Sequence, residues 1–457
     1  MALYILQTLI ALSCLVTLRN WRQGVMMMVL ITAILDPLRK LVPGAPAYLS
    51  LAIVPALILV VGAVIRENKG WWTEFRQNFP GVKRSLYFLL IAAYPAAVIS
   101  ATYGPGSWLL TLFGIFSYGL LILSIIVGFY LPRGPQDIHR LLALYCSLTA
   151  IMLSGTFIDF LGLRPDWPII GTRTLNMEWL RYSSDYVVNL VAGFYRSPDV
   201  MGWHAGATSL LALILATVNQ GSRRYRWIAI SIFASGALML CGRRKMFYQL
   251  PIFLILLGLI YWQAGRKNQV FSLIMLLIVP ALGVWVFGDW IGNNSTVINY
   301  YTDNASPAVD QLQGQGWSNV LETVRQAGFW GDGLGVAAPG SQNLAVARPR
   351  VWQESGPSRL MVELGVPGFI AMLALIISLL RAAWAQVQQH LKLQDPMGLY
   401  GTGLFCFFLA NLGSLTASGQ ILADPFISTF LGLSLGMSLS LARYSQRYSS
   451  ATYLRDR

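Results

Sequence analysis

The feature that most constrains this chain is a series of apolar runs, each close to the length a helix needs to cross a membrane. A helix spans the hydrocarbon of a bilayer with about 20 predominantly apolar residues. Such runs lie at Leu3–Leu18, Ala47–Ile65, Ser85–Ala101, Trp108–Leu131, Leu141–Leu163, Val200–Val218, Trp227–Cys241, Met246–Trp262, Val270–Gly288, Leu360–Leu380, Gly398–Thr416 and Pro425–Ala442. One more run, Gly24–Leu35, is short for a span, so the sequence predicts twelve or thirteen crossings.

The composition agrees with lipid as the solvent of this chain. Hydrophobic residues make up 55% of it and charged residues 11%, against roughly 25% charged residues in a soluble domain. A chain of this kind cannot cover a water-soluble surface, which excludes a soluble enzyme, a secreted disulfide scaffold and a disordered protein. The runs lack the alternation of outer-membrane strands. We therefore expect an all-α polytopic membrane protein, a bundle of about 12–13 transmembrane helices.

The formal charge of +14 reflects membrane topology rather than nucleic-acid binding. The cations gather in short loops between apolar runs, and Lys and Arg in such loops favour the cytoplasmic side. Counting crossings from these loops leaves two longer segments on the outer face, a medium loop at Arg164–Asp199 and a large loop at Asp289–Ser358. The first run has no cleavage site and is predicted to be a retained span. Residues 1–457 are predicted to form a single membrane domain carrying these loops.

The short loop Gly242–Lys245 departs from this pattern. It carries three cations, yet the count of crossings places it on the outer face. Either the cations hold an anion at the outer membrane boundary, or a neighbouring run is re-entrant and returns the loop to the cytoplasm. Both explanations stay open at this stage.

Arginines on the predicted outer face are the first candidates for chemistry. Arg196 directly precedes the run that begins at Val200, and Arg243 and Arg244 follow the run that ends at Cys241. Because guanidinium groups form bidentate bonds to phosphate oxygens, two such sites are suited to hold a diphosphate. Each arginine alone is better explained by anchoring to lipid headgroups, and it is their combination that favours a diphosphate site.

Glu354 lies where the large loop re-enters the membrane, and a partly desolvated carboxylate there can take a proton from a hydroxyl group. The alternative is a solvated carboxylate paired with Arg359. His204 lies about one turn inside its run, where a proton acceptor, a substrate contact and a packed or bonded core histidine are all conceivable. We expect Asp199 to cap the helix that follows it.

Metal and nucleotide chemistry find no support in the motifs. The chain has three histidines and no metal-binding His or Asp motif, and it lacks a phosphate-binding loop. The glycine-rich stretch Gly331–Gly335 has the wrong spacing for a dinucleotide fingerprint and is more typical of a turn or a tight backbone approach. No cofactor and no metal are expected. The four cysteines have no paired spacing and are expected to be small core residues.

Four segments on the predicted outer face, in this order, resemble the O-antigen ligase and O-antigen polymerase superfamily of bacterial glycan-assembly membrane proteins. Ala192–Gly202 is similar to the family's Gly-Thr-Phe-x-Asn-Pro-Asn-x-Leu-Ala/Gly segment, and Cys241–Arg244 stands where the family has a small residue and Ser-Arg. Phe329–Gly335 is similar to the glycine-rich stretch of the large periplasmic loop, and Glu363–Gly368 to the Glu-x-Gly-x-x-Gly at the return of that loop.

The resemblance implies a GT-C-like membrane glycosyltransferase of the bacterial cytoplasmic membrane that needs no cofactor. Its donor would be a glycan on undecaprenyl diphosphate and its acceptor a glycan or lipid-linked sugar, with membrane lipid around it and a chain-length regulator as a possible partner. Arg243, or its neighbour Arg244, would bind the diphosphate, and we expect Arg196 to help neutralise it. Glu354 would be the base, at the position where ligases carry His-Asn, a departure that favours polymerisation or another glycan transfer over ligation to lipid A core. The secondary phosphate or sugar contacts would be Arg244, Arg348, Arg350, Arg359 and His204.

Two other classes of function remain open. The chain is also consistent with a transporter or flippase for a lipid-linked glycan or an anionic solute, and with a non-catalytic scaffold of a polysaccharide export complex. A flippase would leave product on the cytoplasmic side when deleted, whereas a polymerase would leave single repeat units on the outer side.

Overall fold

The computed structural model describes residues 1–164, 166–175, 178–182, 187–266, 317–338, 341, 344, 355–393, 395–417, 419 and 424–445. Among these residues, eight helices are long and apolar enough to cross a membrane: Ala2–Arg19, Tyr48–Glu67, Pro80–Ala101, Trp108–Tyr130, Pro135–Phe160, Pro198–Val218, Gly356–Leu391 and Pro425–Ser445. The prediction of an all-α polytopic membrane protein is thereby confirmed. The predicted crossing Val270–Gly288 lies outside the described residues, and the total of twelve or thirteen stays a prediction.

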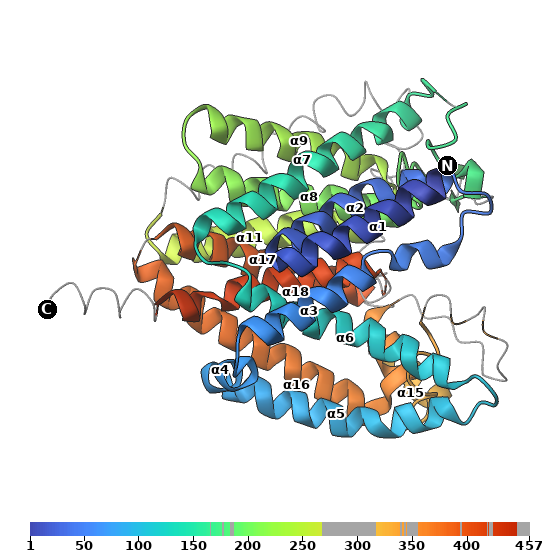
Figure 1. Ribbon diagram of the computed structural model, residues 1–457, viewed down its shortest axis with the longest axis vertical. Coiled ribbons are helices and arrows are strands. Elements are labelled where there is room, and N and C mark those ends of the chain that lie inside the picture. Colours follow the sequence, from blue (N-terminus) through green and yellow to red (C-terminus); the bar gives the residue numbers. More distant parts are fainter. Residues whose placement is uncertain are drawn as a thin grey trace, which may run out of the picture. The chain divides into compact units, whose positions relative to one another are not determined.

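The helices group into two compact units (Figure 1). Unit 1 comprises Met1–Leu59, Pro135–Val309 and Gln394–Ser414, and unit 2 comprises Val60–Gly134, Asp310–Leu393 and Leu415–Arg457. Unit 1 contains α1 (Ala2–Arg19), α2 (Trp21–Lys40), η1 (Ala47–Leu51), α7 (Pro135–Phe160), η2 (Arg173–Leu175), α8 (Pro198–Val218), α9 (Ser222–Leu240), α10 (Arg244–Phe247), α11 (Gln249–Gln263) and most of α17 (Pro396–Ala417). Unit 2 contains most of α3 (Val54–Glu67), and α4 (Trp71–Asn78), α5 (Pro80–Ala101), α6 (Trp108–Tyr130), α15 (Trp317–Ala327), α16 (Gly356–Leu393) and α18 (Pro425–Leu439).

Two three-residue strands lie in the medium loop of unit 1. Strand β1 (Leu180–Tyr182) pairs antiparallel with β2 (Val187–Asn189), and Arg181 lies opposite Val188. The predicted loop Arg164–Asp199 therefore contains a short hairpin between α7 and α8.

Helix α2 is longer than its apolar run suggests. The sequence shows Gly24–Leu35 as a short run, but the helix covers the 20 residues Trp21–Lys40, and the side chain of Asn20 accepts a hydrogen bond from the amide of Arg22 at its start. Polar residues at both ends continue the helix beyond the run. Its length is about 30 Å at 1.5 Å per residue. The runs assigned to α9, α11 and α17 also form helices, although these three are not among the eight.

Helix α8 is the core of unit 1. Every residue from Pro198 to Ala216 is buried, and the helix packs against α7, α9 and α11. Its few polar side chains have partners on neighbouring helices: Thr208 bonds Thr149 at 2.6 Å, and Trp203 Nε1 donates to Asn411 Oδ1 at 2.8 Å. A helix buried on all sides lies within a bundle rather than at its surface.

In unit 2, glycines let α6 and α18 pack backbone against backbone. A Cβ atom at Gly128 would overlap the carbonyl oxygen of Leu433, and one at Gly436 would overlap that of Ile125. Small residues at such contacts favour helix association in lipid, where the hydrophobic effect does not drive it.

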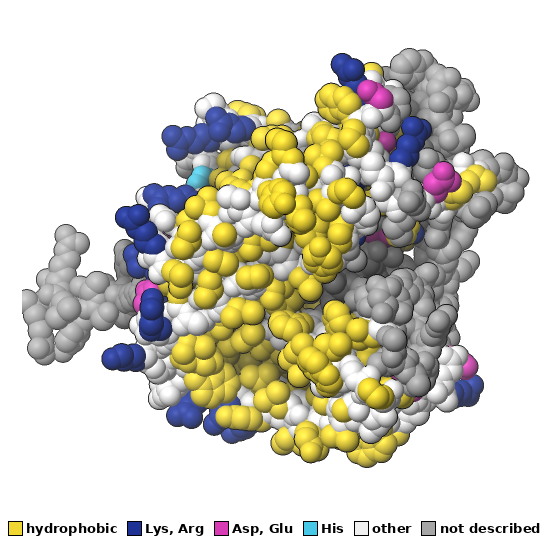
Figure 2. Space-filling model, turned by 45° about the vertical axis from the view of Figure 1, so that its right-hand side comes forward, with side chains coloured by type: hydrophobic (Ala, Val, Ile, Leu, Met, Phe, Trp, Pro, Cys, Tyr) yellow, Lys and Arg dark blue, Asp and Glu magenta, His cyan; other side chains and the backbone are white. Residues whose placement is uncertain are grey.

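Much of the exposed surface of the described helices is apolar. Figure 2 shows broad areas of hydrophobic side chains, with Lys and Arg side chains at their margins. On α5, Ile91 is 73% exposed and Tyr94 is 71% exposed. A surface of this kind is suited to lipid rather than water.

Candidate functional site

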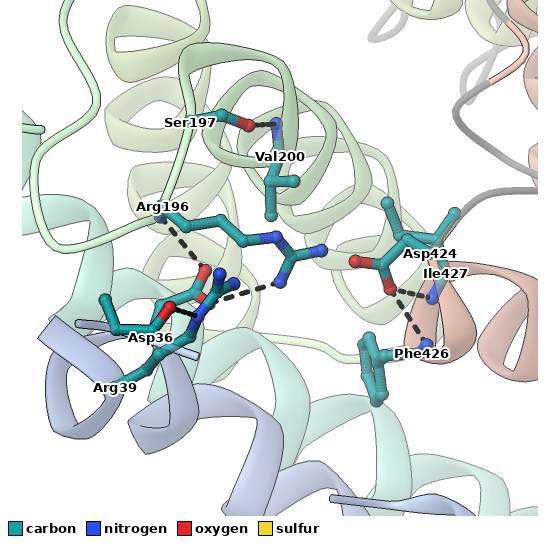
Figure 3. A network of polar contacts seen from close by, with 9 residues as sticks. Asp36, Arg39, Arg196, Ser197, Val200, Asp424, Phe426 and Ile427 are labelled. Carbon is teal, nitrogen blue, oxygen red and sulfur yellow. Dashed lines mark hydrogen bonds and ion pairs between the residues drawn. The ribbon is translucent and has the colours of Figure 1, made fainter. Parts of the chain in front are cut away.

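The first candidate site lies at the N-terminal end of α8 in unit 1. The helix begins at Pro198, and its cap is Ser197, whose hydroxyl accepts a hydrogen bond from the amide of Val200 at 3.2 Å (Figure 3). The expectation that Asp199 caps this helix was therefore wrong. Asp199 is held instead by a guanidinium from another helix end, as described below.

Arg196 is bound to Asp36, which lies on α2. The guanidinium Nη1 lies 3.1 Å from Asp36 Oδ1, and the backbone amide of Arg196 donates to Oδ2 at 3.1 Å (Figure 3). Arg39 lies beside this pair and donates its Nε to the carbonyl of Ala45 at 3.0 Å. The carboxylate is thus bound by both the main chain and the side chain of one residue, which fixes the direction of the guanidinium.

Arg243 is bound to Asp199 in the same unit. Its Nη2 lies 3.0 Å from Asp199 Oδ2, and its guanidinium carbon lies 5.4 Å from the ring centre of Trp179. The Nε of Arg243 and the indole nitrogen of Trp179 are buried, with no hydrogen-bond partner among the described residues. Buried donors of this kind cost free energy unless a further group satisfies them.

The loop that carries Arg196 is held tightly at Gly193. Lys40 Nζ donates to the carbonyl of Gly193 at 2.9 Å and to that of Ile169 at 3.1 Å. On the other side, Asp159 Oδ2 accepts the amides of Ala192 and Gly193 at 3.2 and 2.9 Å. Buried Lys40 and the carboxylate of Asp159 therefore fix the loop through its backbone. We call Asp36, Lys40, Asp159, Arg196, Asp199 and Arg243 the α8 entry cluster.

His204 lies one turn further along α8. Its Nδ1 is 2.9 Å from the hydroxyl of Tyr145 on α7, and its ring stacks on that of Tyr195 with centroids 4.9 Å apart. Only 4% of the residue is exposed. These contacts agree with the alternative of a packed histidine bonded to a neighbouring helix.

Two segments that carried the family resemblance meet in unit 1. A Cβ atom at Gly202 would come within 2.8 Å of the sulfur of Cys241, and one at Gly242 would overlap the side chain of Leu190. Gly193 has φ +56°, and a Cβ there would lie 2.6 Å from the amide nitrogen of Thr156 on α7. The small residues of Ala192–Gly202 and Cys241–Arg244 are therefore needed for close packing, whatever the arginines bind.

The other two segments meet in unit 2, where α16 is broken. Gly365 has φ 67° and ψ −173°, which interrupts the helix just before Val366 and Pro367. The glycine-rich loop docks at this break: the amide of Asp332 donates to the carbonyl of Val362 at 2.7 Å, and the amide of Val366 to that of Phe329 at 2.9 Å. The expected tight backbone approach at Gly331–Gly335 is confirmed.

The same loop also inserts between α5 and α6. The amide of Leu334 donates to the carbonyl of Ala96 at 3.0 Å, and the hydroxyl of Tyr103 donates to the carbonyl of Asp332 at 2.7 Å. Partial burial raises the pKa of the Asp332 carboxyl. The hydrogen bonds that hold this loop to α5, α6 and α16 involve its backbone atoms. Non-helical backbone at the depth of the membrane is tolerated where it is buried in protein, because its polar groups then find partners there.

The first half of α16 carries a buried charge network. Arg359 Nε lies 3.1 Å from Glu363 Oε1, and both side chains are almost fully buried. The hydroxyl of Tyr118 donates to Glu363 Oε2 at 2.6 Å, and Arg359 Nη2 donates to Ser117 Oγ at 3.3 Å. Tyr118 is ten residues into α6, which is about 15 Å from the start of that helix. The network therefore lies near the middle of a span.

The structure describes the positions of some of the predicted site residues. It brings Arg196 and Arg243 to one end of α8 and places His204 in an aromatic stack. Arg359 is predicted from the sequence as a secondary phosphate or sugar contact, but the structure buries its guanidinium against Glu363 and Ser117. Four predicted site groups lie outside the described part of the chain: Glu354, Arg348, Arg350 and the side chain of Arg244.

Sequence reasoning missed the carboxylates that bind these arginines. Asp36 follows an apolar run and precedes two cations, an arrangement that is typical of an ordinary helix end. Glu363 begins the Glu-x-Gly-x-x-Gly motif, and its i,i+4 spacing from Arg359 already indicates a helical ion pair. Nothing local pointed to Tyr118, which is 245 residues from Glu363 along the chain.

Comparison with protein-family models and with curated protein sequences finds no match to this chain. The fold itself places the chain among polytopic helical membrane proteins. The four segments resemble the glycan-assembly superfamily, and neither comparison adds support for that resemblance.

Proposed function

We propose that the chain is a membrane glycosyltransferase, similar to O-antigen polymerases and ligases, which transfers or polymerises glycan units carried on undecaprenyl diphosphate. The reaction takes place at the outer face of the bacterial cytoplasmic membrane. The observation that carries this proposal is the pair of arginines, Arg196 and Arg243, at the N-terminal end of α8, each oriented by a buried aspartate. An arginine held in this way can meet the oxygens of a diphosphate without first ordering its own side chain.

The α8 entry cluster is balanced in formal charge, and Arg39 beside it adds the one positive charge in excess that suits an anionic leaving group. Lys40, Arg196 and Arg243 lie together with Asp36, Asp159 and Asp199, and Arg39 adds one more cation beside Asp36. The amide end of α8 contributes a further partial positive charge. Arginine and a helix N-terminus are the groups that proteins use to stabilise negative charge developing on phosphate oxygens.

In the proposed reaction, a hydroxyl oxygen of the acceptor sugar forms a bond to the anomeric carbon of the donor. The bond from that carbon to the diphosphate oxygen breaks, and its electron pair leaves with undecaprenyl diphosphate. Glu354 takes the proton of the acceptor hydroxyl, and Arg196 and Arg243 balance the charge on the departing diphosphate. Arg244, Arg348 and Arg350 are secondary contacts, whereas we assign Arg359 to the support of α16. No cofactor enters the proposal.

Within unit 2, the two ends of α6 differ in a way that supports the proposed orientation. The end at Tyr130 contacts Trp71 and Glu74 on α4, which lies in the strongly basic segment Arg66–Arg84. The opposite end, at Leu110 and Gly114, contacts the glycine-rich loop. Positive charge favours the cytoplasmic side, so we assign the loop end to the outer face. With α2 as a crossing, the amino terminus also lies outside.

A complemented deletion strain tests this function. We expect the deletion to remove long glycan chains while single lipid-linked units remain on the outer side of the membrane. Arg243→Ala and Glu354→Gln should fail to restore chain length, and Arg243→Lys should restore it in part because it keeps the charge but loses the bidentate geometry. Arg325→Gln is the matched control, since Arg325 is exposed on α15 and pairs only weakly with Glu322 at 3.7 Å. The measurements are the lipid-linked and cell-surface glycan profiles.

Three outcomes would redirect the assignment. Unchanged polymer length and amount with both Arg243→Ala and Glu354→Gln would contradict it. Loss of glycan-capped lipid A, with polymer retained on the lipid carrier, would identify a ligase. Normal activity of every arginine variant, together with loss of assembly in the deletion, would indicate a non-catalytic scaffold.

A second function, transport of a lipid-linked glycan or an anionic solute, is favoured by one observation in unit 2. Helix α16 is discontinuous at Gly365, and its first half carries the buried Arg359–Glu363 pair near the middle of a span. Broken helices and buried charges at mid-depth are typical of transporters. A transporter would leave lipid-linked units on the cytoplasmic side in the deletion strain, whereas the proposed transferase leaves them on the outer side.

A further inference from the structure

Helix α4 connects two spanning helices at the basic end of unit 2. It covers the eight residues Trp71–Asn78, between the candidate spans Tyr48–Glu67 and Pro80–Ala101. Because α3 ends just before it and α5 begins just after it, we place α4 at the membrane interface, between the hydrocarbon and the lipid headgroups. The hydroxyl of Tyr130, the last residue of α6, donates to the carbonyl of Trp71 at 2.9 Å. This bond holds α4 beside the end of α6.

One side of α4 is anchored by aromatic rings. Phe75 is buried and packs edge-to-face against Phe79 and Phe129, with ring centres 5.2 and 5.4 Å apart. Trp72 lies partly exposed beside Tyr87, and Lys83 Nζ lies 5.8 Å from the centre of the Tyr87 ring. Trp and Tyr at this level are typical of the membrane interface, where one side of the ring is apolar and the other is wet.

The carboxylate of α4 is already neutralised by groups of the protein. Glu74 Oε1 accepts a hydrogen bond from Arg443 Nε at 2.9 Å, and Oε2 accepts one from the hydroxyl of Tyr130 at 2.8 Å. Arg443 itself stacks over Tyr130, with its guanidinium carbon 4.4 Å from the ring centre. Glu74 is therefore not available to neutralise the cations around it.

Those cations have no carboxylate partner within the described part of the chain. Five lie at or beside α4, and we call them the α4 basic surface: Arg66, Lys69, Arg76, Lys83 and Arg84. Three of them, Arg66, Lys69 and Arg84, are exposed, and the other two are half-buried. The remaining acid of this segment, Glu67, forms a long pair of 3.9 Å with exposed Arg133. The surface therefore carries an excess of positive charge next to interfacial aromatic rings.

We infer that the α4 basic surface binds the headgroups of anionic phospholipids. The phosphate of such a lipid would meet the cations, while its acyl chains continue along the exposed apolar face of α5, where Leu90 and Ile91 lie outward. Each cation near an anionic membrane surface adds binding free energy, and an aromatic ring at the interface sets its depth. This inference is independent of the glycan chemistry proposed above, because it concerns the opposite end of unit 2 from the glycine-rich loop.

Native mass spectrometry of the purified full chain in detergent tests the inference, with phosphatidylglycerol or phosphatidylcholine added. The test variant is Lys69→Gln/Arg76→Gln/Arg84→Gln, and the matched control, Arg223→Gln/Arg224→Gln/Arg226→Gln, removes the same charge from the exposed start of α9. We expect the test variant to bind phosphatidylglycerol at least about tenfold more weakly, with the control within about twofold of the unchanged protein and little binding of phosphatidylcholine throughout.

A charge-retaining variant, Lys69→Arg/Arg76→Lys/Arg84→Lys, separates lost binding from lost folding, since it should keep the affinity for phosphatidylglycerol. Equal weakening in the α4 and α9 variants would overturn the inference, because binding would then follow total charge. Unchanged binding in the α4 variant would overturn it as well. Displacement of phosphatidylglycerol by excess inorganic phosphate would also count against it, since the site would then recognise the free anion rather than the lipid.

Discussion

At the scale of single residues, this chain stabilises half-buried arginines with carboxylates that are far away in sequence. Arg196 is 160 residues from Asp36, and Arg443 is 369 residues from Glu74. Glycines act at the same scale, since the absence of a side chain at Gly335 lets the loop lie against the backbone of α6. The local motif indicates which residues are small or charged, but the partner is chosen by tertiary packing.

The glycine at position 335 provides a test with a close internal control. Gly335 has φ +82°, and a Cβ there would overlap the carbonyl oxygen of Leu110 and lie 2.8 Å from the amide of Gly114. Gly106 has nearly the same backbone, φ +81°, but nothing lies within 4 Å of an added Cβ. We expect Gly106→Ala to show only the cost of the left-handed backbone, about 1–2 kcal/mol. Gly335→Ala should lose about 1–3 kcal/mol more through overpacking.

Thermal unfolding of the two glycine variants in the same detergent measures this difference. Equal losses of stability in Gly335→Ala and Gly106→Ala would show that the glycine-rich loop does not pack against α6 as described.

At the scale of elements, α16 is the helix whose interruption matters most. The break at Gly365 provides the place where the backbone of Phe329 and Asp332 can bond to the helix. The half-helix before the break is held by Arg359, Glu363 and Tyr118. A charge network inside a span is costly unless every member is paired. The network therefore fixes the half-helix strongly, because moving it would separate the charges.

Substitutions at this pair test its energetics. We expect Arg359→Met or Glu363→Leu alone to lose about 3–5 kcal/mol of stability, since each leaves one uncompensated buried charge. The double variant Arg359→Met/Glu363→Leu should be less destabilised than either single variant, because it removes both charges at once. Chemical denaturation of the three purified proteins gives the values. Simple additivity of the two single losses would contradict the description of a coupled, buried pair.

At the scale of the whole molecule, the helices described form two compact units, and unit 2 has two chemically distinct ends. In unit 2, one end carries α4 and its basic surface and the other carries the glycine-rich loop. Helix α6 separates them by its 23 residues, which corresponds to about 34 Å and matches the thickness of a bilayer core. The prediction of one membrane domain is untested by this division.

Cysteine labelling of whole cells tests this arrangement. In a Cys14→Ser background, the three remaining thiols are buried. We expect a membrane-impermeant maleimide to label Arg325→Cys, on α15, in intact cells. It should label Lys69→Cys, beside α4, only after the cells are permeabilised. Both side chains are exposed, so labelling of both from the same side would contradict the opposite placement of the two ends.

The sequence by itself determined the solvent of this protein and most of its helices, because a run of apolar residues long enough for a span is a local property that lipid enforces. It also indicated Arg196 and Arg243 as unusual, and the tight approach of Gly331–Gly335. Only the tertiary structure decided what binds those arginines and that α2 extends beyond its apolar run. It also showed that α16 is interrupted at Gly365, just after a buried charge network. Ion pairs between distant segments depend on which helices pack together, and no local spacing records that choice.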